Sequence, residues 1–124
     1  MSEILVDTNV VLRYLLRDNE VQSQIAKVLI QSGARLLPEV LMETSHVLRT
    51  FYGIDRPNIA KQLLTVLNWV ELENKDVMIR AVEIFAETKL DFVYCILAAY
   101  HELKGCVVFT FDKKLNNQFR REEK

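Results

Sequence analysis

Short apolar runs alternate along this chain with longer segments in which apolar residues recur every three or four positions. The short runs are typical of buried strands, and the longer segments are typical of amphipathic helices. The predicted strands are Ile4–Val6, Arg35–Leu37, Val70–Leu72 and Val107–Phe109. Because strands that alternate with helices pair in parallel, the pattern predicts an α/β fold with a parallel sheet covered by helices on both faces.

Capping residues, prolines and glycines mark where the helices begin and end. The predicted helices begin after Asp7, after Asn19, at Pro38, at Pro57, after Asn74 and at Phe92. The positions expected on their buried faces include Ile25, Val28 and Leu29 in the second helix and Val40, Leu41, Thr44, Val47, Leu48 and Phe51 in the third. The spacing of these residues brings each set onto one side of its helix.

The chain has 124 residues, half of them apolar, and this length predicts one domain over residues 1–124. No apolar stretch is long enough to cross a membrane. The first residues have neither the basic region nor the cleavage site of a signal peptide, so we expect a cytoplasmic protein that does not bind membranes. Cys95 and Cys106 are expected to be buried, reduced thiols, and His46 and His101 are assigned no chemistry.

The net charge is −1, which gives no overall case for nucleic-acid binding. The charge is unevenly distributed, because residues 113–124 carry five basic and two acidic side chains. A basic end beside an acidic body is consistent with a phosphate-binding edge next to a metal site, and Lys113 and Lys114 are the candidates. A solvated helix end explains the same charges.

Four carboxylates occupy positions that suit a ligand-binding or catalytic site. Asp7 and Asp112 each follow a predicted strand, and ligands of open α/β sheets bind at the carboxyl ends of strands. Glu43 lies at the margin of an apolar helical face, and Asp91 precedes a helix. Taken singly, each has a structural explanation as a helix cap, a turn residue or a solvent-edge residue.

The four acids together point to a metal. Carboxylates that repel one another tolerate close approach when a cation lies between them. Oxygen ligands without a Cys/His pair favour Mg²⁺ or Mn²⁺, ions that activate water for attack on a phosphodiester.

Three segments resemble the motifs of the PIN-domain family, and specifically of its VapC-type toxin ribonucleases. These segments are Ile4–Asn9, Pro38–Thr44 and Thr110–Leu115, whose acids are Asp7, Glu43 and Asp112. The resemblance covers essentially the whole chain. In a fourth segment, Asp91–Ala99, the family's usual third metal-site acid falls on Tyr94, a neutral phenol, and Asp91 lies one turn earlier.

The resemblance implies a three-layer sandwich with a four- to five-stranded parallel sheet. It implies a divalent ion held by Asp7, Glu43 and Asp112, with Asp91 as a further catalytic acid and with Thr8, Asn9 and Thr110 in support. The implied substrate is single-stranded RNA, and the implied partners are an antitoxin protein and a second copy of the chain.

Two alternatives remain open. Tyr94 suggests a degenerate PIN domain that binds RNA or a protein partner and cleaves weakly or not at all. A phosphoryl-transfer enzyme with Asp7 as its nucleophile would suit the same fold class, but the chain has no glycine-rich phosphate loop.

Overall fold

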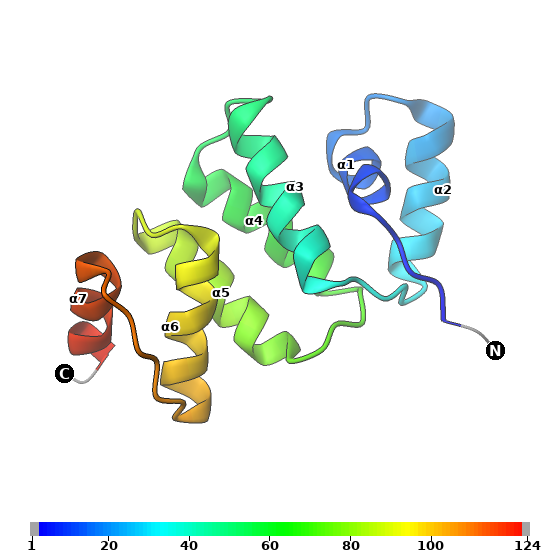
Figure 1. The fold of residues 1–124 in the computed structure, drawn as a ribbon. Helices are drawn as coiled ribbons and strands as arrows, with labels where there is room; N and C mark the ends of the chain where they lie inside the picture. The colour runs from blue at the N-terminus through cyan, green and yellow to red at the C-terminus, as the bar shows by residue number, and fades with distance from the viewer. Residues whose placement is uncertain (1–2, 123–124) are drawn as a thin grey trace.

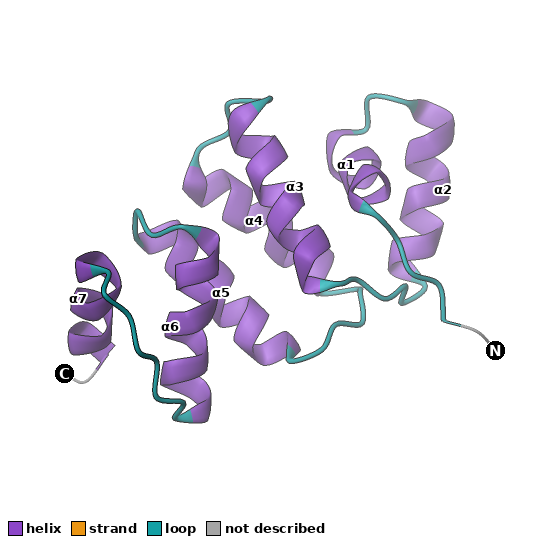
Figure 2. Cartoon of the chain, viewed as in Figure 1, coloured by secondary structure: helices purple, strands orange, loops and turns teal. Residues whose placement is uncertain are grey.

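The computed structural model describes residues 3–122, and this part of the chain forms seven helices joined by loops (Figures 1 and 2). The helices are α1 (Thr8–Leu16), α2 (Glu20–Gln31), α3 (Pro38–Thr50), α4 (Arg56–Leu67), α5 (Lys75–Glu87), α6 (Phe92–Lys104) and α7 (Lys113–Glu122). Six of them lie where the start signals in the sequence predict a helix. The last helix, α7, covers the basic C-terminal segment.

Side-chain caps explain several of the helix starts. Asp7, Asn19 and Asp55 accept hydrogen bonds from the backbone amides of Val10, Gln22 and Asn58 at 3.1, 3.0 and 2.9 Å. Each cap satisfies an amide that has no partner within its own helix. The third helix has no side-chain cap and begins instead with Pro38, which has no amide hydrogen to satisfy.

The predicted parallel sheet, and with it the three-layer sandwich, is wrong. The described residues contain no strand, and extended segments meet only in two isolated parallel bridges. Arg35 lies between Leu5 and Glu71 and pairs with both. Two backbone hydrogen bonds support each bridge, for example Arg35 N to Ile4 O and Leu36 N to Glu71 O, both at 2.8 Å.

The length of the apolar runs explains the error. A run of three apolar residues is shorter than most strands, and at Ile4–Val6 the helix cap Asp7 follows at once. The segment Val107–Phe109 has no secondary structure, and the side chains of Val107 and Phe109 are 97% and 80% exposed. An apolar run of three residues therefore does not distinguish a strand of a sheet from a single bridge or a loop.

Some predicted burial is also wrong. Ile25 and Val28 point outward, because α2 buries Ala26 and Ile30 instead. Phe51 is exposed where α3 ends. The prediction of buried thiols holds for Cys95, whose pKa burial raises to about 11, but Cys106 is exposed.

The helices are arranged as a series, from α1 and α2 at one end of the molecule to α7 at the other (Figure 1). Neighbours in this series pack on one another: α1 on α2 and α3, α3 on α4, α4 on α5, α5 on α6, and α6 on α7. Their inward faces supply a continuous core that includes Leu41, Leu48, Leu63, Ile84 and Leu115. No helix in residues 3–122 is both long and apolar enough to cross a membrane.

The loop before α7 offers a direct test of this arrangement. Replacing Val107 and Phe109 together with Ser should change the free energy of unfolding by no more than about 0.5 kcal/mol, as expected for exposed positions. Leu63→Ala, at a fully buried position, should cost about 2–5 kcal/mol. Urea denaturation compares the two, and a double variant as unstable as Leu63→Ala would show that the loop packs in a core.

Candidate functional site

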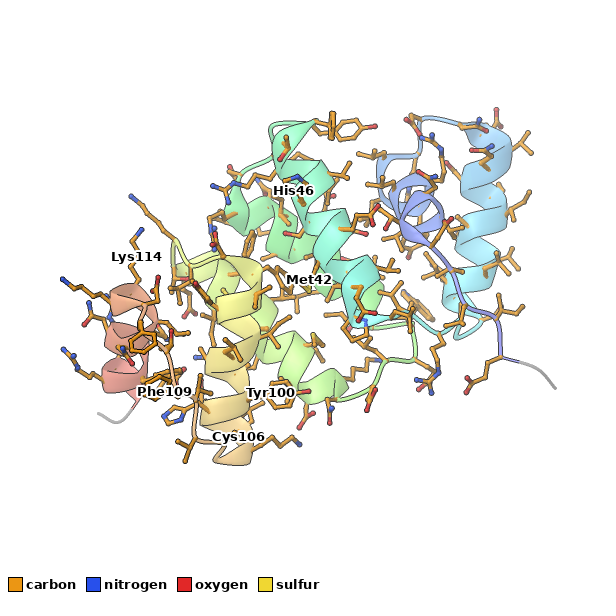
Figure 3. All side chains as sticks on the ribbon, viewed as in Figure 1. Met42, His46, Tyr100, Cys106, Phe109 and Lys114 are labelled. Carbon is orange, nitrogen blue, oxygen red and sulfur yellow. The ribbon has the colours of Figure 1, made fainter. Side chains whose placement is uncertain are left out.

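Asp91 and Asp112 line the same pocket, which has a volume of about 310 Å³. Asp91 immediately precedes α6 and Asp112 immediately precedes α7, and these two helices pack together. The pocket is also lined by Lys89, Leu90, Tyr94, Lys113 and Lys114. Figure 3 shows Lys114 at the start of α7. The structure therefore brings together two of the four predicted acids, both predicted lysines and Tyr94.

Hydrogen bonds within the turn before α7 fix the position of Asp112. The Thr110 hydroxyl accepts a hydrogen bond from the Asp112 amide at 3.0 Å, and Asp112 Oδ1 accepts one from the amide of Leu115 at 2.9 Å. The Asn116 side chain donates to the Thr110 carbonyl at 3.2 Å. Leu115 is fully buried and anchors the turn to the core. One carboxylate oxygen of Asp112 is thus committed to the helix, and Thr110 supports the arrangement.

Asp91 is held differently. It occupies the N-cap position of α6, but its side chain makes no capping hydrogen bond. Its backbone carbonyl accepts the Cys95 amide at 3.0 Å, so the backbone is fixed while the carboxylate is exposed. The capping explanation of Asp91 therefore does not account for its side chain, which is available to a ligand. Tyr94 is half-buried in the first turn of the same helix and packs against the core.

Asp7 lies elsewhere. It lines a different pocket between α1 and α2, also of about 310 Å³, together with Asn9, Val10 and Arg13. Its neighbour Thr8 is buried in the first turn of α1. Asp7 precedes α1 and Asp112 precedes α7, and Figure 1 shows these two helices at opposite ends of the molecule. The structure does not bring these two acids together.

Glu43 is also separate from the pocket of Asp91 and Asp112. It is exposed on α3 and lines neither that pocket nor the Asp7 pocket. Within residues 3–122, no three His, Cys, Asp or Glu side chains are grouped so that they could hold a metal ion. The ligand set Asp7, Glu43 and Asp112 is thus not assembled in this structure.

Sequence reasoning missed several basic and amide residues near the pocket. Lys89 lines it, and an adjoining groove adds Arg56, Gln118 and Arg121. A signal for part of this set was present, because Lys114, Gln118 and Arg121 are spaced four and three residues apart and so share one face of a helix. Nothing in the local sequence marks Arg56, which reaches the groove from another helix.

The pocket is lined by three lysines, a residue type that binds phosphate oxygens, together with two carboxylates. The chain matches the PIN domain family over residues 4–119, nearly its whole length, and it belongs to that family. PIN domains are a family of nucleases, and they typically bind divalent metal ions. No curated protein and no solved structure matched the chain.

Proposed function

We propose that this protein is a metal-dependent endoribonuclease that cleaves single-stranded RNA at the pocket of Asp91 and Asp112. The observation that carries the proposal is the meeting of two carboxylates and three lysines at one pocket in a member of a nuclease family. Lysines neutralise the phosphates of a bound RNA strand, and the two carboxylates can hold the metal ion that cleavage requires.

The residues of this pocket fit a Mg²⁺ or Mn²⁺ ion that is shared with the substrate. Mg²⁺ is commonly held by one or two carboxylates together with phosphate oxygens and water, without a complete protein cage. Asp91 and Asp112 would hold it here. When bound, the ion would lower the pKa of a water molecule and neutralise charge on the phosphodiester.

The side chains around these two acids have distinct roles in the proposal. Lys113 and Lys114 bind the phosphates on either side of the cleaved bond, and Lys89 supports them from the turn before α6. One oxygen of the exposed Asp91 carboxylate would hold the ion, and the other would accept the proton of the water that attacks phosphorus as the bond from phosphorus to the departing RNA strand breaks. The Tyr94 hydroxyl can donate a hydrogen bond to a phosphate oxygen.

Cleavage by the purified protein tests the proposal. Unstructured and structured RNAs are incubated with the protein in Mg²⁺, in Mn²⁺ and in a chelator, and the products are separated by size. We expect internal cuts in the unstructured RNA that require the ion. Uncut RNA in both metals would overturn the proposal.

A second candidate function is RNA or protein binding without efficient cleavage. Tyr94 favours it, because a phenol stands where the family usually has an acid, and so does the missing three-acid cluster in residues 3–122. Binding of RNA that persists in the chelator, with no cleavage in either metal, would support this alternative.

The proposed biological role is that of a cytoplasmic toxin neutralised by an antitoxin protein, and the proposed assembly is a homodimer. Exposed apolar side chains support association, since Val21, Ile25 and Val28 form an outward stripe on α2 and Phe109 and Phe111 are exposed before α7 (Figure 3 labels Phe109). Sedimentation at micromolar concentration should show a dimer, and a protein that stays monomeric would contradict this assembly.

A further inference from the structure

A larger groove opens beside the pocket of Asp91 and Asp112. It has a volume of about 630 Å³ and lies between the start of α4, the turn from α5 to α6, and α7. The groove and the pocket share Lys89, Leu90 and Lys114, so a strand bound in the pocket can continue into the groove. We propose that the groove is a second phosphate-binding site, which holds the backbone of the RNA strand beyond the cleaved bond. This inference rests on the proposed function, because it takes single-stranded RNA as the ligand.

Arg56, the first residue of α4, is the most buried cation of this groove. Its guanidinium carbon lies 3.8 Å from the centre of the Phe85 ring, its Nε donates to the Phe85 carbonyl at 2.9 Å, and its Nη2 donates to the Leu90 carbonyl. These contacts fix the guanidinium, but they use only two of the N–H donors that an arginine carries. Because Arg56 lines the groove, the remaining donors can serve an anion that enters it.

The positive charge of Arg56 is not balanced by a carboxylate. Burial lowers the pKa of the guanidinium from its ordinary value, yet arginine stays charged at neutral pH. Its two partners are neutral carbonyls, and no acid within residues 3–122 forms an ion pair with it. A partly buried charge loses solvation energy, which contact with an opposite charge can offset. A phosphate in the groove would supply that charge, and its oxygens match the fork of a guanidinium.

Three exposed cations complete the lining of the groove. Lys89 lies in the turn before α6, and Lys114 and Arg121 lie on α7. In the part of the chain that the structure describes, none of the three forms an ion pair. With the arginine of α4 the groove has four cationic side chains, against the two acids Asp55 and Glu87. The excess of positive charge suits a ligand with several negative charges, such as the backbone of RNA.

The spacing of the cations on α7 gives the groove a direction. Lys114 and Arg121 are two helical turns apart, so they lie on the same side of α7 and about 10 Å apart along its axis. Lys114 also lines the pocket of the two acids, whereas Arg121 lines the groove only. A strand that leaves the pocket along α7 therefore meets Lys114 first and Arg121 at a later phosphate.

Binding without cleavage tests the inference. Fluorescence anisotropy of labelled oligo(U) of about twelve nucleotides is measured in chelator, so that no RNA is cut, and at several salt concentrations. Arg121→Gln should weaken binding about fivefold, as expected for the loss of one exposed charge pair. It should also lower the slope of log affinity against log salt by about 0.7, the value for one phosphate contact on a single strand.

The neighbouring arginine provides the matched control. Arg120→Gln makes the same change in charge on the same helix, but Arg120 does not line the groove, so affinity and salt slope should stay near those of the wild type. Both arginines are exposed, so neither variant should change the melting temperature. Arg56→Gln should weaken binding about tenfold, because it removes a partly buried charge. Lys113→Gln, which changes the pocket alone, should weaken binding by a factor that multiplies that of Arg121→Gln if one strand contacts both.

The outcomes distinguish this inference from the proposed function. Equal losses in Arg121→Gln and Arg120→Gln would overturn the groove site even if the protein cleaves RNA. A loss specific to Arg121→Gln in a protein that never cleaves RNA would leave the inference standing and overturn the proposed nuclease activity. Inorganic phosphate or a poly-glutamate peptide, at equal ionic strength, should compete only weakly with the labelled RNA. Competition as strong as that of unlabelled RNA would overturn the RNA strand as the ligand, in favour of a free phosphate or an acidic protein segment respectively.

Discussion

Replacing Asp112 with Asn should lower the rate of metal-dependent RNA cleavage by at least about 100-fold, the lower end of what a positioned acid or base contributes. The change removes the charge that would hold the ion. It keeps the turn, because Asn caps a helix about as well as Asp and can still accept the hydrogen bond from the Leu115 amide. The melting temperature should therefore stay close to that of the wild type, and the loss of rate can be assigned to chemistry.

Two further variants sharpen this experiment. Asp76→Asn removes an exposed carboxylate that pairs with Lys104 at 2.8 Å, outside the pocket, and should leave the rate unchanged. Asp7→Asn distinguishes the two possible ligand sets. A rate near that of the wild type would support the pocket of Asp91 and Asp112 as the whole site, whereas a loss as large as that of Asp112→Asn would contradict it and favour the set inferred from the family motifs. A fully active Asp112→Asn protein would exclude both sets.

Local signals in the sequence predicted the helices well. A cap such as Asp7 or a proline such as Pro38 acts within one turn, so its effect can be read from neighbouring residues. The sheet could not be predicted in this way, because a strand forms only if a segment distant in the sequence lies beside it and pairs with its backbone. Arg35 shows the limit, since it pairs with both Leu5 and Glu71, but only as single bridges.

The candidate site was predicted only in part. The resemblance to the family motifs identified Asp112 and Asp91 as candidate acids, and the structure brings their side chains to one pocket. The same motifs also named Asp7 and Glu43, but strand ends meet at one edge only if the strands form a sheet, and the described residues have none. Arg56 could not be found from sequence, because its contacts with Phe85 and Leu90 join residues about 30 positions apart.

Tyr94 is the position at which a single change should most increase metal binding. It lies at the third position of α6, in the same pocket as Asp91 and Asp112. An aspartate there would be the third carboxylate around one space, and the number of carboxylates largely sets the affinity for a hard cation. The exposed amides at the start of a helix also favour a negative charge at this position. Without the ion, however, three like charges repel one another, and the packing of the phenol against the core is lost.

Tyr94→Asp should therefore melt below the wild type in chelator and regain stability in Mn²⁺. With free ion at about 100 times its dissociation constant, binding stabilises the folded state by about 2.7 kcal/mol, which for a domain of this size is a rise of about 10 °C. Tyr94→Asn is the matched control, because it loses the same packing without gaining a charge, and its melting temperature should rise in Mn²⁺ no more than that of the wild type. Differential scanning calorimetry of both variants and the wild type measures the shifts, and the cleavage assay then shows whether the added carboxylate also raises the rate. If Tyr94→Asp and Tyr94→Asn melt alike in Mn²⁺, the pocket is not a metal site, and binding without cleavage becomes the better account of this protein.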